Sequence, residues 1–328
     1  MARIVSLGSA LQDLYLIDHD DFAATDVYST TAMARESLFG ELKIGTKVDI
    51  DRLAYEVGGG GTNAATTFAR HGHESIFIGN IGHDTAGDAI LACLDKEGID
   101  SSYVSFVPKK STGCSVILLD TISGERTILT HRGASAKFDN LSENDLDTIS
   151  PDWLYVTSFR GDIDTLRRFF KKAKSMGAKI MFNPGKLELE QSKKLISLLE
   201  YVDILLVNKV EASQIVPGTI LTELLARLLN YVKTAIITDG SMGAIASDHQ
   251  EFYRFGLYED LPVKDTTGAG DAFGSGFLAH FAAGKSFYDS LVFASANSTS
   301  VFTKLGAKKG ILTGKEHLHQ MPIQEIKL

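Results

Sequence analysis

Segments typical of strands and segments typical of helices alternate through most of this chain. Because each helix must bring the chain back to the same end of the sheet, this order predicts parallel strands covered by helices on both faces. We therefore expect an α/β fold with a doubly wound, mostly parallel sheet. The expected strands are 4–7, 75–78, 154–157, 179–182, 204–207 and 235–238, and the expected helices are 62–71, 85–97, 163–176, 189–200, 221–231 and 270–283.

The composition supports a folded protein and argues against two classes of partner. Hydrophobic residues make up 44% of the 328 residues, enough for a full core. The net charge of −8, without a long basic run, argues against a nucleic-acid partner. No run approaches the roughly 20 apolar residues of a membrane span. Cys93 and Cys114 lack metal-ligand spacing, so we expect a reduced, cytoplasmic protein.

A glycine-rich stretch, DTTGAGDAFGSGFL at residues 265–278, carries the clearest chemical information. Gly268, Ala269 and Gly270 have almost no side chain, and an apolar run typical of a helix follows them. The free N–H groups of a helix N-terminus bind phosphate readily. Asp271 would repel that phosphate unless it takes a proton from a hydroxyl that attacks phosphorus. The stretch therefore predicts phosphoryl transfer to a hydroxyl-bearing small molecule.

Two motifs resemble signatures of one family. Residues 265–278 resemble the C-terminal signature of the PfkB, or ribokinase-like, carbohydrate and nucleoside kinases, and GGGTNAA at 59–65 resembles the N-terminal one. The order of the two is the expected one. Ribokinases carry a lysine within the N-terminal signature, where Gly61 or a neighbour stands in this chain. This departure argues against ribose itself as the acceptor.

The resemblance implies a large α/β domain with a small β-sheet lid inserted into it. The lid falls on the two regions where the alternation fails, which include an expected hairpin of 114–119 with 126–130. The family also implies a homodimer through this lid. The large domain is expected from residues 1–13, 58–101 and 132–328, and the lid from 14–57 and 102–131.

The resemblance also implies the two halves of an active site. Asp271 is the expected base and Gly268, Ala269 and Gly270 the expected anion hole, with ATP and Mg²⁺ as cofactors. The expected acceptor contacts are Asp13, Gly59, Gly60 and Asn63. The expected nucleotide and Mg²⁺ contacts are Asn208, Glu211, Thr238, Gly240, Gly243 and Asn297, and Asp265 and Thr267 are the expected ligands of K⁺.

Several of these residues have a simpler interpretation. Asn208 and Glu211 fit an ordinary helix cap, Asn297 a satisfied asparagine on a helix surface, and Asp265 a turn. Asp13, taken alone, fits an exposed loop. Arg160 fits either an anionic acceptor, such as a sugar phosphate or sugar acid, or a surface position.

Two alternatives to a sugar kinase stay open. The spacing of Asp13, Asp18 and Phe22 faintly resembles adenosine kinases, so the acceptor could be a nucleoside. A non-catalytic sugar- or nucleotide-binding regulator on the same fold is the alternative from another class. The intact Gly-Ala-Gly-Asp argues against it, because a binding protein has no need of the base. Turnover of ATP separates the two.

Overall fold

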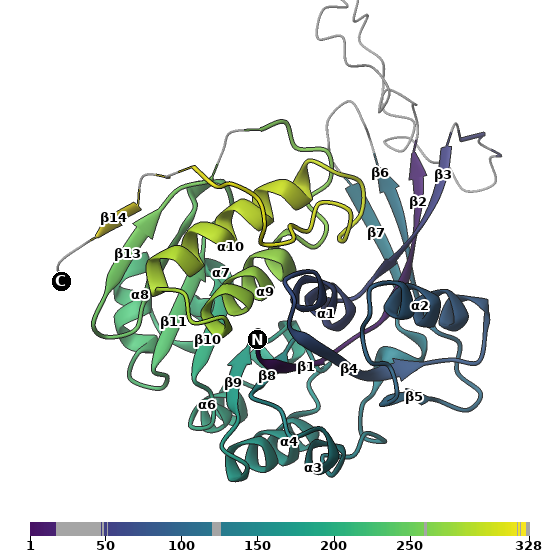
Figure 1. The fold of residues 1–328 in the computed structure, drawn as a ribbon, viewed down its shortest axis with the longest axis horizontal. Helices are drawn as coiled ribbons and strands as arrows, with labels where there is room; N and C mark the ends of the chain where they lie inside the picture. The colour runs from purple at the N-terminus through teal and green to yellow at the C-terminus, as the bar shows by residue number, and fades with distance from the viewer. Residues whose placement is uncertain are drawn as a thin grey trace, which may run out of the picture.

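The computed structural model describes residues 1–17, 47, 49–50, 52–119, 126–258, 261–319, 321 and 323–325. The larger of two sheets in this part of the chain has ten strands, in the order β14-β13-β12-β11-β10-β9-β8-β1-β4-β5 (Figure 1). The neighbours from β11 to β5 are parallel, and β12, β13 and β14 add an antiparallel edge. The strands are β1 (Arg3–Leu7), β4 (Glu74–Ile81), β5 (Val104–Phe106), β8 (Trp153–Val156), β9 (Lys179–Phe182), β10 (Ile204–Asn208), β11 (Thr234–Thr238), β12 (Ala244–Ser247), β13 (Phe252–Phe255) and β14 (Ile323–Glu325).

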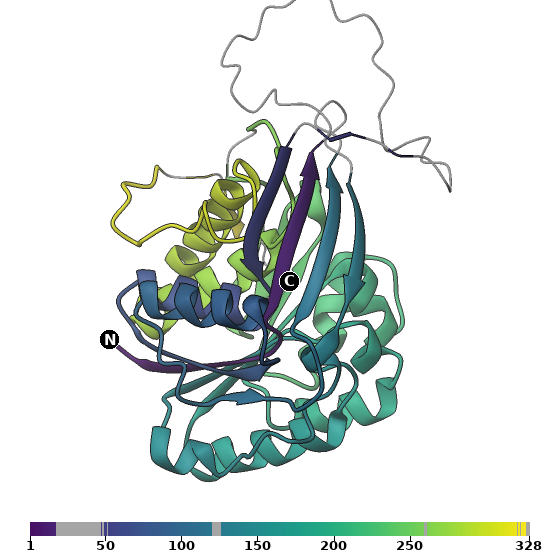
Figure 2. The same ribbon diagram turned by 90° about the vertical axis from the view of Figure 1, so that its right-hand side faces the viewer.

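Helices cover both faces of the large sheet, because its central strands are apolar on both sides. One core joins α4, α6, α7 and α8 to one face, and a second joins α1, α9 and α10 to the other. Figure 2 shows the two groups on opposite sides of the sheet. The expected doubly wound α/β fold is confirmed. The helices are α1 (Gly60–Arg70), α2 (Thr85–Lys96), α3 (Asp145–Ile149), α4 (Ile163–Ser175), α5 (Lys186–Leu189), α6 (Ser192–Leu199), α7 (Lys209–Ile215), α8 (Leu221–Leu228), α9 (Ala269–Ala282) and α10 (Phe287–Phe302), with short 3-10 turns η2 (Gly133–Ala136) and η3 (Gly240–Met242).

Two glycines of α9 allow this helix to lie close to its neighbours. A Cβ at Gly274 would lie 2.5 Å from the Tyr155 hydroxyl, and one at Gly276 would lie 3.1 Å from the Asn297 amide nitrogen. These small residues are therefore packing positions. The close approach holds the N-terminus of α9 in a fixed place at the sheet edge.

A second sheet of four strands stands at one end of the molecule (Figure 2). Its order is β3-β2-β6-β7, with β2 and β6 parallel in the middle. The strands are β2 (Leu11–Ile17), β3 (Arg52–Gly58), β6 (Gly113–Leu119) and β7 (Arg126–His131). The expected hairpin of β6 with β7 is confirmed, while its turn at 120–125 and most of 14–57 lie outside the described residues.

The boundaries of this sheet differ from those drawn on the sequence. β2 already begins at Leu11, and β5, within the stretch 102–131, pairs with β4 of the large sheet. The lid role of the small sheet remains a prediction.

Two helix boundaries were wrong. α1 begins at Gly60 with Gly59 as its N-cap, whereas the expected helix began at residue 62. The Thr62 hydroxyl instead donates to the Gly58 carbonyl over 2.7 Å. The range 189–200, expected to be one helix, holds the end of α5 and all of α6, with Glu190 and Gln191 between them.

In the described part of the chain, none of the helices is both long and apolar enough to cross a membrane.

Candidate active site

The N-terminus of α9 forms an open backbone site. Gly268 caps the helix in the left-handed conformation, with a φ of 79°, and a Cβ there would lie 2.4 Å from that of Ala307. Only glycine meets both constraints. A Cβ at Gly270 would meet no atom within 4 Å, so free space lies in front of the first turn.

The free amides of this turn are fewer than expected. The Ala269 amide donates to the Thr266 carbonyl over a long 3.3 Å. Within the described residues, the amides of Gly270 and Asp271 have no acceptor. These two N–H groups, at the positive end of the helix dipole, are the strongest anion donors here.

Asp271 has the surroundings of a general base. Burial raises the pKa of its carboxyl group, while a hydrogen bond from Asn63 and the charge of Lys308 lower it. The Asn63 amide donates to Oδ2 over 2.9 Å. Oδ1 has no hydrogen-bond partner in the described chain, so it can take a proton. A carboxyl group whose pKa is raised above its usual value is a better proton acceptor once it is ionised.

Asn63 contacts Asp271, whereas the sequence placed it beside the acceptor. Its Oδ1 accepts a 2.6 Å hydrogen bond from Lys308, while its Nδ2 donates to Asp271. One N–H of the amide is left for any further contact. Its position on α1 thus links two segments far apart in the sequence.

Asp13 lies on the inward face of β2 and is 5% exposed, so the exposed-loop interpretation was wrong. Burial raises the pKa of its carboxyl group to about 6, against a hydrogen bond from Ser115 and the charge of Lys308. A Cβ at Gly58 would lie 1.9 Å from Asp13 Oδ2. The glycine at 58 therefore makes room for this carboxylate.

The glycine loop lies between the ends of two strands. Gly59 has a φ of 96°, and a Cβ there would lie 2.4 Å from the Ser9 carbonyl. A Cβ at Gly60 would meet the Thr157 side chain at 3.0 Å, and one at Gly61 would lie 2.6 Å from the ring of a core phenylalanine. The Thr157 hydroxyl is buried without a partner in the described chain. This residue, at the end of β8, was not singled out from the sequence.

The guanidinium group of Arg132 lies near both Asp13 and Arg160. Burial and the charge of Arg160 lower the pKa of Arg132, and the Asp13 carboxylate opposes that shift. Neither arginine has an ion-pair partner among the described residues. Arg160 has a φ of 58°, in a loop whose amides at 159 and 161 donate to the fully buried Glu188 over 2.8 and 2.6 Å. The loop that presents Arg160 is therefore fixed from beneath.

Asp265 is a buried organiser of the loop before α9. Its Oδ1 accepts from the Thr267 amide over 2.9 Å, and its Oδ2 accepts from the Gly306 amide over 3.0 Å and from the Tyr15 hydroxyl over 2.8 Å. The Thr267 hydroxyl lies beside that of Tyr15 without a well-formed hydrogen bond. The turn interpretation of Asp265 holds, and the unpaired hydroxyl leaves one oxygen ligand free for a cation.

A cavity of about 400 Å³ begins at the same helix end. Apolar side chains dominate its walls, as in sites for flat aromatic groups. Expected residues that line it are Thr238, Gly240, Gly243, Ala269 and Gly270. Residues not expected from the sequence include Leu257, Leu261, Val263, Ser295, Ser298, Thr299 and Phe302.

The α10 wall of this cavity was detectable in the sequence. Ser295, Ser298, Thr299 and Phe302 follow the spacing of one helix face. Asn297, which was expected here, does not reach the cavity. It is fully buried, donates to the Ala272 carbonyl over 2.7 Å and accepts from the Leu312 amide over 2.8 Å. Of the helix-surface interpretation, the satisfied hydrogen bonds were correct and the surface position was wrong.

Asn208 and Glu211 form a reciprocal cap on α7. Asn208 Oδ1 accepts from the Glu211 amide over 2.9 Å, and Glu211 Oε2 accepts from the Asn208 amide over 2.8 Å. Burial raises the pKa of the Glu211 carboxyl group. Its Oε1 has no partner in the described chain. The cap interpretation is therefore confirmed, and one carboxylate oxygen remains for a metal-bound water. No cluster of three metal-ligating side chains occurs among the described residues.

The family model described as pfkB family carbohydrate kinase matches residues 1–313. The chain belongs to the PfkB family of carbohydrate kinases. The ribokinase of Haemophilus influenzae is 28% identical over 277 residues, which cover 81% of this chain and 87% of that protein. The fructokinase of Salmonella typhimurium is 29% identical over 244 residues, covering 71% and 79%.

A solved PfkB-family structure has the same fold. The ribokinase of Arabidopsis thaliana, complexed with ribose and ATP, superposes with a TM-score of 0.76 and 25% identity, over 95% of this chain and 96% of that one. The expected ribokinase-like fold and carbohydrate-kinase class are thus confirmed.

Proposed function

We propose that this PfkB-family chain transfers the γ-phosphoryl group of ATP to a primary hydroxyl of a sugar or sugar-like acceptor. One observation carries the proposal: Gly270 lines the apolar cavity, its amide and that of Asp271 have no acceptor among the described residues, and the Asp271 carboxylate belongs to the same first turn of α9. An anion site, a base and an aromatic-sized cavity then meet at one helix end. The ATP complex of the Arabidopsis ribokinase supports the choice of nucleotide.

The acceptor hydroxyl oxygen attacks the γ-phosphorus, and its proton passes to Asp271 Oδ1. The bond from that phosphorus to the β,γ-bridging oxygen breaks, and ADP leaves with the electron pair. The amides of Gly270 and Asp271 stabilise the transferred group, with Gly268 and Ala269 shaping the turn. Mg²⁺, when bound, neutralises phosphate charge, and Asn208 and Glu211 would hold its waters.

The nucleotide base would occupy the apolar cavity. Thr238, Gly240 and Gly243 would approach the ribose and phosphates through their backbone, since the glycines there have positive φ values of 56° and 83°. Ser295, Ser298 and Thr299 on α10 would contact the edge of the nucleotide base, the role that was expected of Asn297 from the sequence.

The acceptor would lie between Asp13 and the glycine loop at Gly59 and Gly60. The Asp13 carboxylate can accept from two neighbouring hydroxyls of a sugar. Arg132 and Arg160 favour an acceptor with a carboxylate or phosphate, because two close guanidinium groups repel each other unless an anion joins them. A nucleoside lacks such a group, so it is the second candidate. Asp18 and Phe22, on which that alternative rested, lie outside the described residues.

The four-stranded sheet would act as the lid over this acceptor. Asp13 and Tyr15 face inward, while Leu53, Tyr55 and Leu129 on its two edge strands are 47%, 62% and 58% exposed. A second copy of this chain is the proposed partner for that apolar face.

A panel of pentoses, hexoses, sugar acids, sugar phosphates and nucleosides, with ADP detection, tests the function. Asp271→Asn should keep fold and ATP binding and lower kcat on the order of 10²–10⁴-fold, the usual range for losing a general base. A variant within a few-fold of wild type would remove Asp271 from this role. ATP binding without turnover on any acceptor would favour the regulator.

A further inference from the structure

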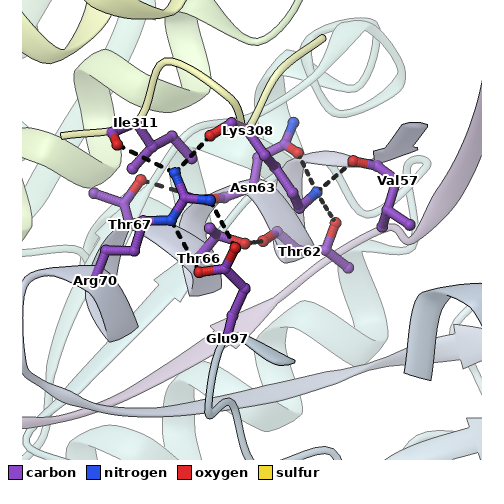
Figure 3. A network of polar contacts seen from close by, with 9 residues as sticks. All are labelled: Val57, Thr62, Asn63, Thr66, Thr67, Arg70, Glu97, Lys308 and Ile311. Carbon is purple, nitrogen blue, oxygen red and sulfur yellow. Dashed lines mark hydrogen bonds and ion pairs between the residues drawn. The ribbon is translucent and has the colours of Figure 1, made fainter. Parts of the chain in front are cut away.

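Lys308 places a buried ammonium group next to the base. The residue is 7% exposed, and its Nζ donates to the Val57 carbonyl over 2.7 Å, to Thr62 Oγ1 over 2.8 Å and to Asn63 Oδ1 over 2.6 Å (Figure 3). These three bonds use all the donors of an ammonium group. Lys308 forms no ion pair with the described carboxylates, although burying a charge is costly.

This ammonium determines which way the Asn63 amide points. An ammonium group donates and cannot accept, so the amide oxygen must face Lys308. The NH₂ end then faces Asp271, where it donates to Oδ2 over 2.9 Å. The reverse orientation would set the amide oxygen against the carboxylate and the NH₂ group against the ammonium.

The backbone around Lys308 is fixed independently of its side chain. Arg70 Nη1 donates to the Lys308 and Ile311 carbonyls over 2.7 and 3.1 Å, and Arg70 Nη2 contacts Glu97 at 2.6 Å (Figure 3). Ala307, the preceding residue, packs against the glycine that caps α9. The same short segment therefore touches the anion hole and the support of the base.

We propose that Lys308 is a positioning residue for phosphoryl transfer, which locks the Asn63 amide so that Asp271 Oδ1 stays free and directed at the acceptor hydroxyl. The proposal rests on the proposed function. The positive charge has a second effect, because it favours the ionised, proton-accepting form of Asp271.

The pKa of Lys308 is set by burial and by the charged groups around its ammonium group. Burial lowers the pKa of Lys308 to about 8, and Cys93, Asp13, Asp271 and Glu97 oppose that shift. At neutral pH the lysine is therefore mostly charged. Losing its charge should make Asp271 protonate at higher pH.

Lys308→Met tests the proposal, with Lys309→Met as a matched control because that side chain is 53% exposed and pairs with Glu56. Lys308→Met should lower kcat on the order of 10- to 100-fold, as expected when a reacting group is misplaced, with ATP affinity unchanged. The loss should be larger at pH 6 than at pH 7.5, because the acid limb of the kcat profile moves to higher pH. The control should keep both rate and profile.

A double-mutant cycle separates positioning from a general packing role. If Lys308 acts through Asn63, adding Lys308→Met to Asn63→Leu should cost little beyond Asn63→Leu alone. Additive losses, or an unmoved acid limb, would overturn the proposal. If Lys308→Met does not fold, Lys308→Gln replaces it, because glutamine is neutral but can still donate a hydrogen bond. This variant should also move the acid limb of the kcat profile to higher pH. If the wild-type protein forms no ADP with any acceptor, the proposed function is wrong, and so is the Lys308 proposal that rests on it. If the wild type is active and only the Lys308 results differ from these expectations, the Lys308 proposal alone is wrong.

Discussion

The Tyr15 hydroxyl donates a 2.8 Å hydrogen bond to Asp265 Oδ2, which ties the four-stranded sheet to the loop before α9. Both residues are buried, at 0% and 1% exposure. The inward face of the proposed lid therefore contacts the segment that shapes the anion hole. A change at this contact can reach both the proposed acceptor site on the small sheet and the proposed phosphate site at the start of α9.

We expect activity to be higher in K⁺ than in Na⁺, with Asp265 and Thr267 at the cation site. The Thr267 hydroxyl has no hydrogen-bond partner among the described residues, so its oxygen is available to a cation. Tyr15→Phe, which removes a donor to Asp265, should reduce the difference between the two cations. Steady-state rates in matched KCl, NaCl and tetramethylammonium chloride measure this. Equal rates in all three would exclude a functional cation site.

Glu211→Gln should leave the fold intact and raise the Mg²⁺ concentration needed for half-maximal rate. The glutamine oxygen can still accept from the Asn208 amide, so the cap survives while the charge facing metal-bound water is lost. A Mg²⁺ titration at saturating ATP measures the change. Glu223→Gln, on α8 and in an exposed pair with Arg227, is the control. Identical Mg²⁺ curves would make Glu211 a helix cap and nothing more.

The sequence predicted the alternating core better than the site around it. Strands and helices from β8 to β11 follow from local apolar patterns, and β9 matches its expected bounds at Lys179–Phe182. The pairing of β2 with β3 joins Leu11 to Gly58, a long-range contact that no local pattern contains. Such pairing depends on the whole fold, so it was not predicted.

Side-chain roles that depend on contacts between distant residues could not be predicted from the sequence either. The motif identified Asn63 and Asp271 as site residues, but their mutual contact needed the packing of α1 against α9. Lys308 lies in no motif. Only the three buried hydrogen bonds of its ammonium group, seen in the structure, point to a role in the site. Asn297 was misplaced because a buried amide and a cavity-facing amide look the same in one sequence.

Acid should destabilise the protein through His280 on α9, which packs against α10 and against the ring of His71. His280 stacks on Phe293 at 4.0 Å, and burial lowers its pKa to about 4, with help from His71 and Lys285 and against Asp289. The folded state binds fewer protons than the unfolded state between about pH 4 and 6.5, so this stability is complete above 6.5 and is lost as pH falls.

His280→Phe keeps the stacking and removes this titration. Its free energy of unfolding should depend less on pH between 4 and 6.5 than that of the wild type. Urea denaturation at several pH values measures the slope. Parallel curves for the two proteins would show that His280 does not carry the effect.

Asp13→Asn should stabilise the protein while it damages acceptor use. Burial raises the Asp13 pKa from 3.8 to about 6, so ionising this side chain costs stability above that range. Between pH 4 and 6 the folded state binds more protons than the unfolded one, and the penalty grows to about 3 kcal/mol at neutral pH. The neutral amide avoids it, so the variant should unfold at higher urea at pH 7.5 and match the wild type near pH 4.

The same variant should lose acceptor affinity, because the charged oxygens that accept from two hydroxyls are gone. Losing a charged hydrogen bond costs roughly 1.5–3 kcal/mol, which is about a 10- to 150-fold loss in kcat/KM. Steady-state kinetics on the best acceptor measure this loss, and ATP affinity by calorimetry is the control. A stabilised variant with intact acceptor kinetics would show that Asp13 is buried for another reason. Loss of ATP binding with an unchanged acceptor KM would place Asp13 in the nucleotide half of the site.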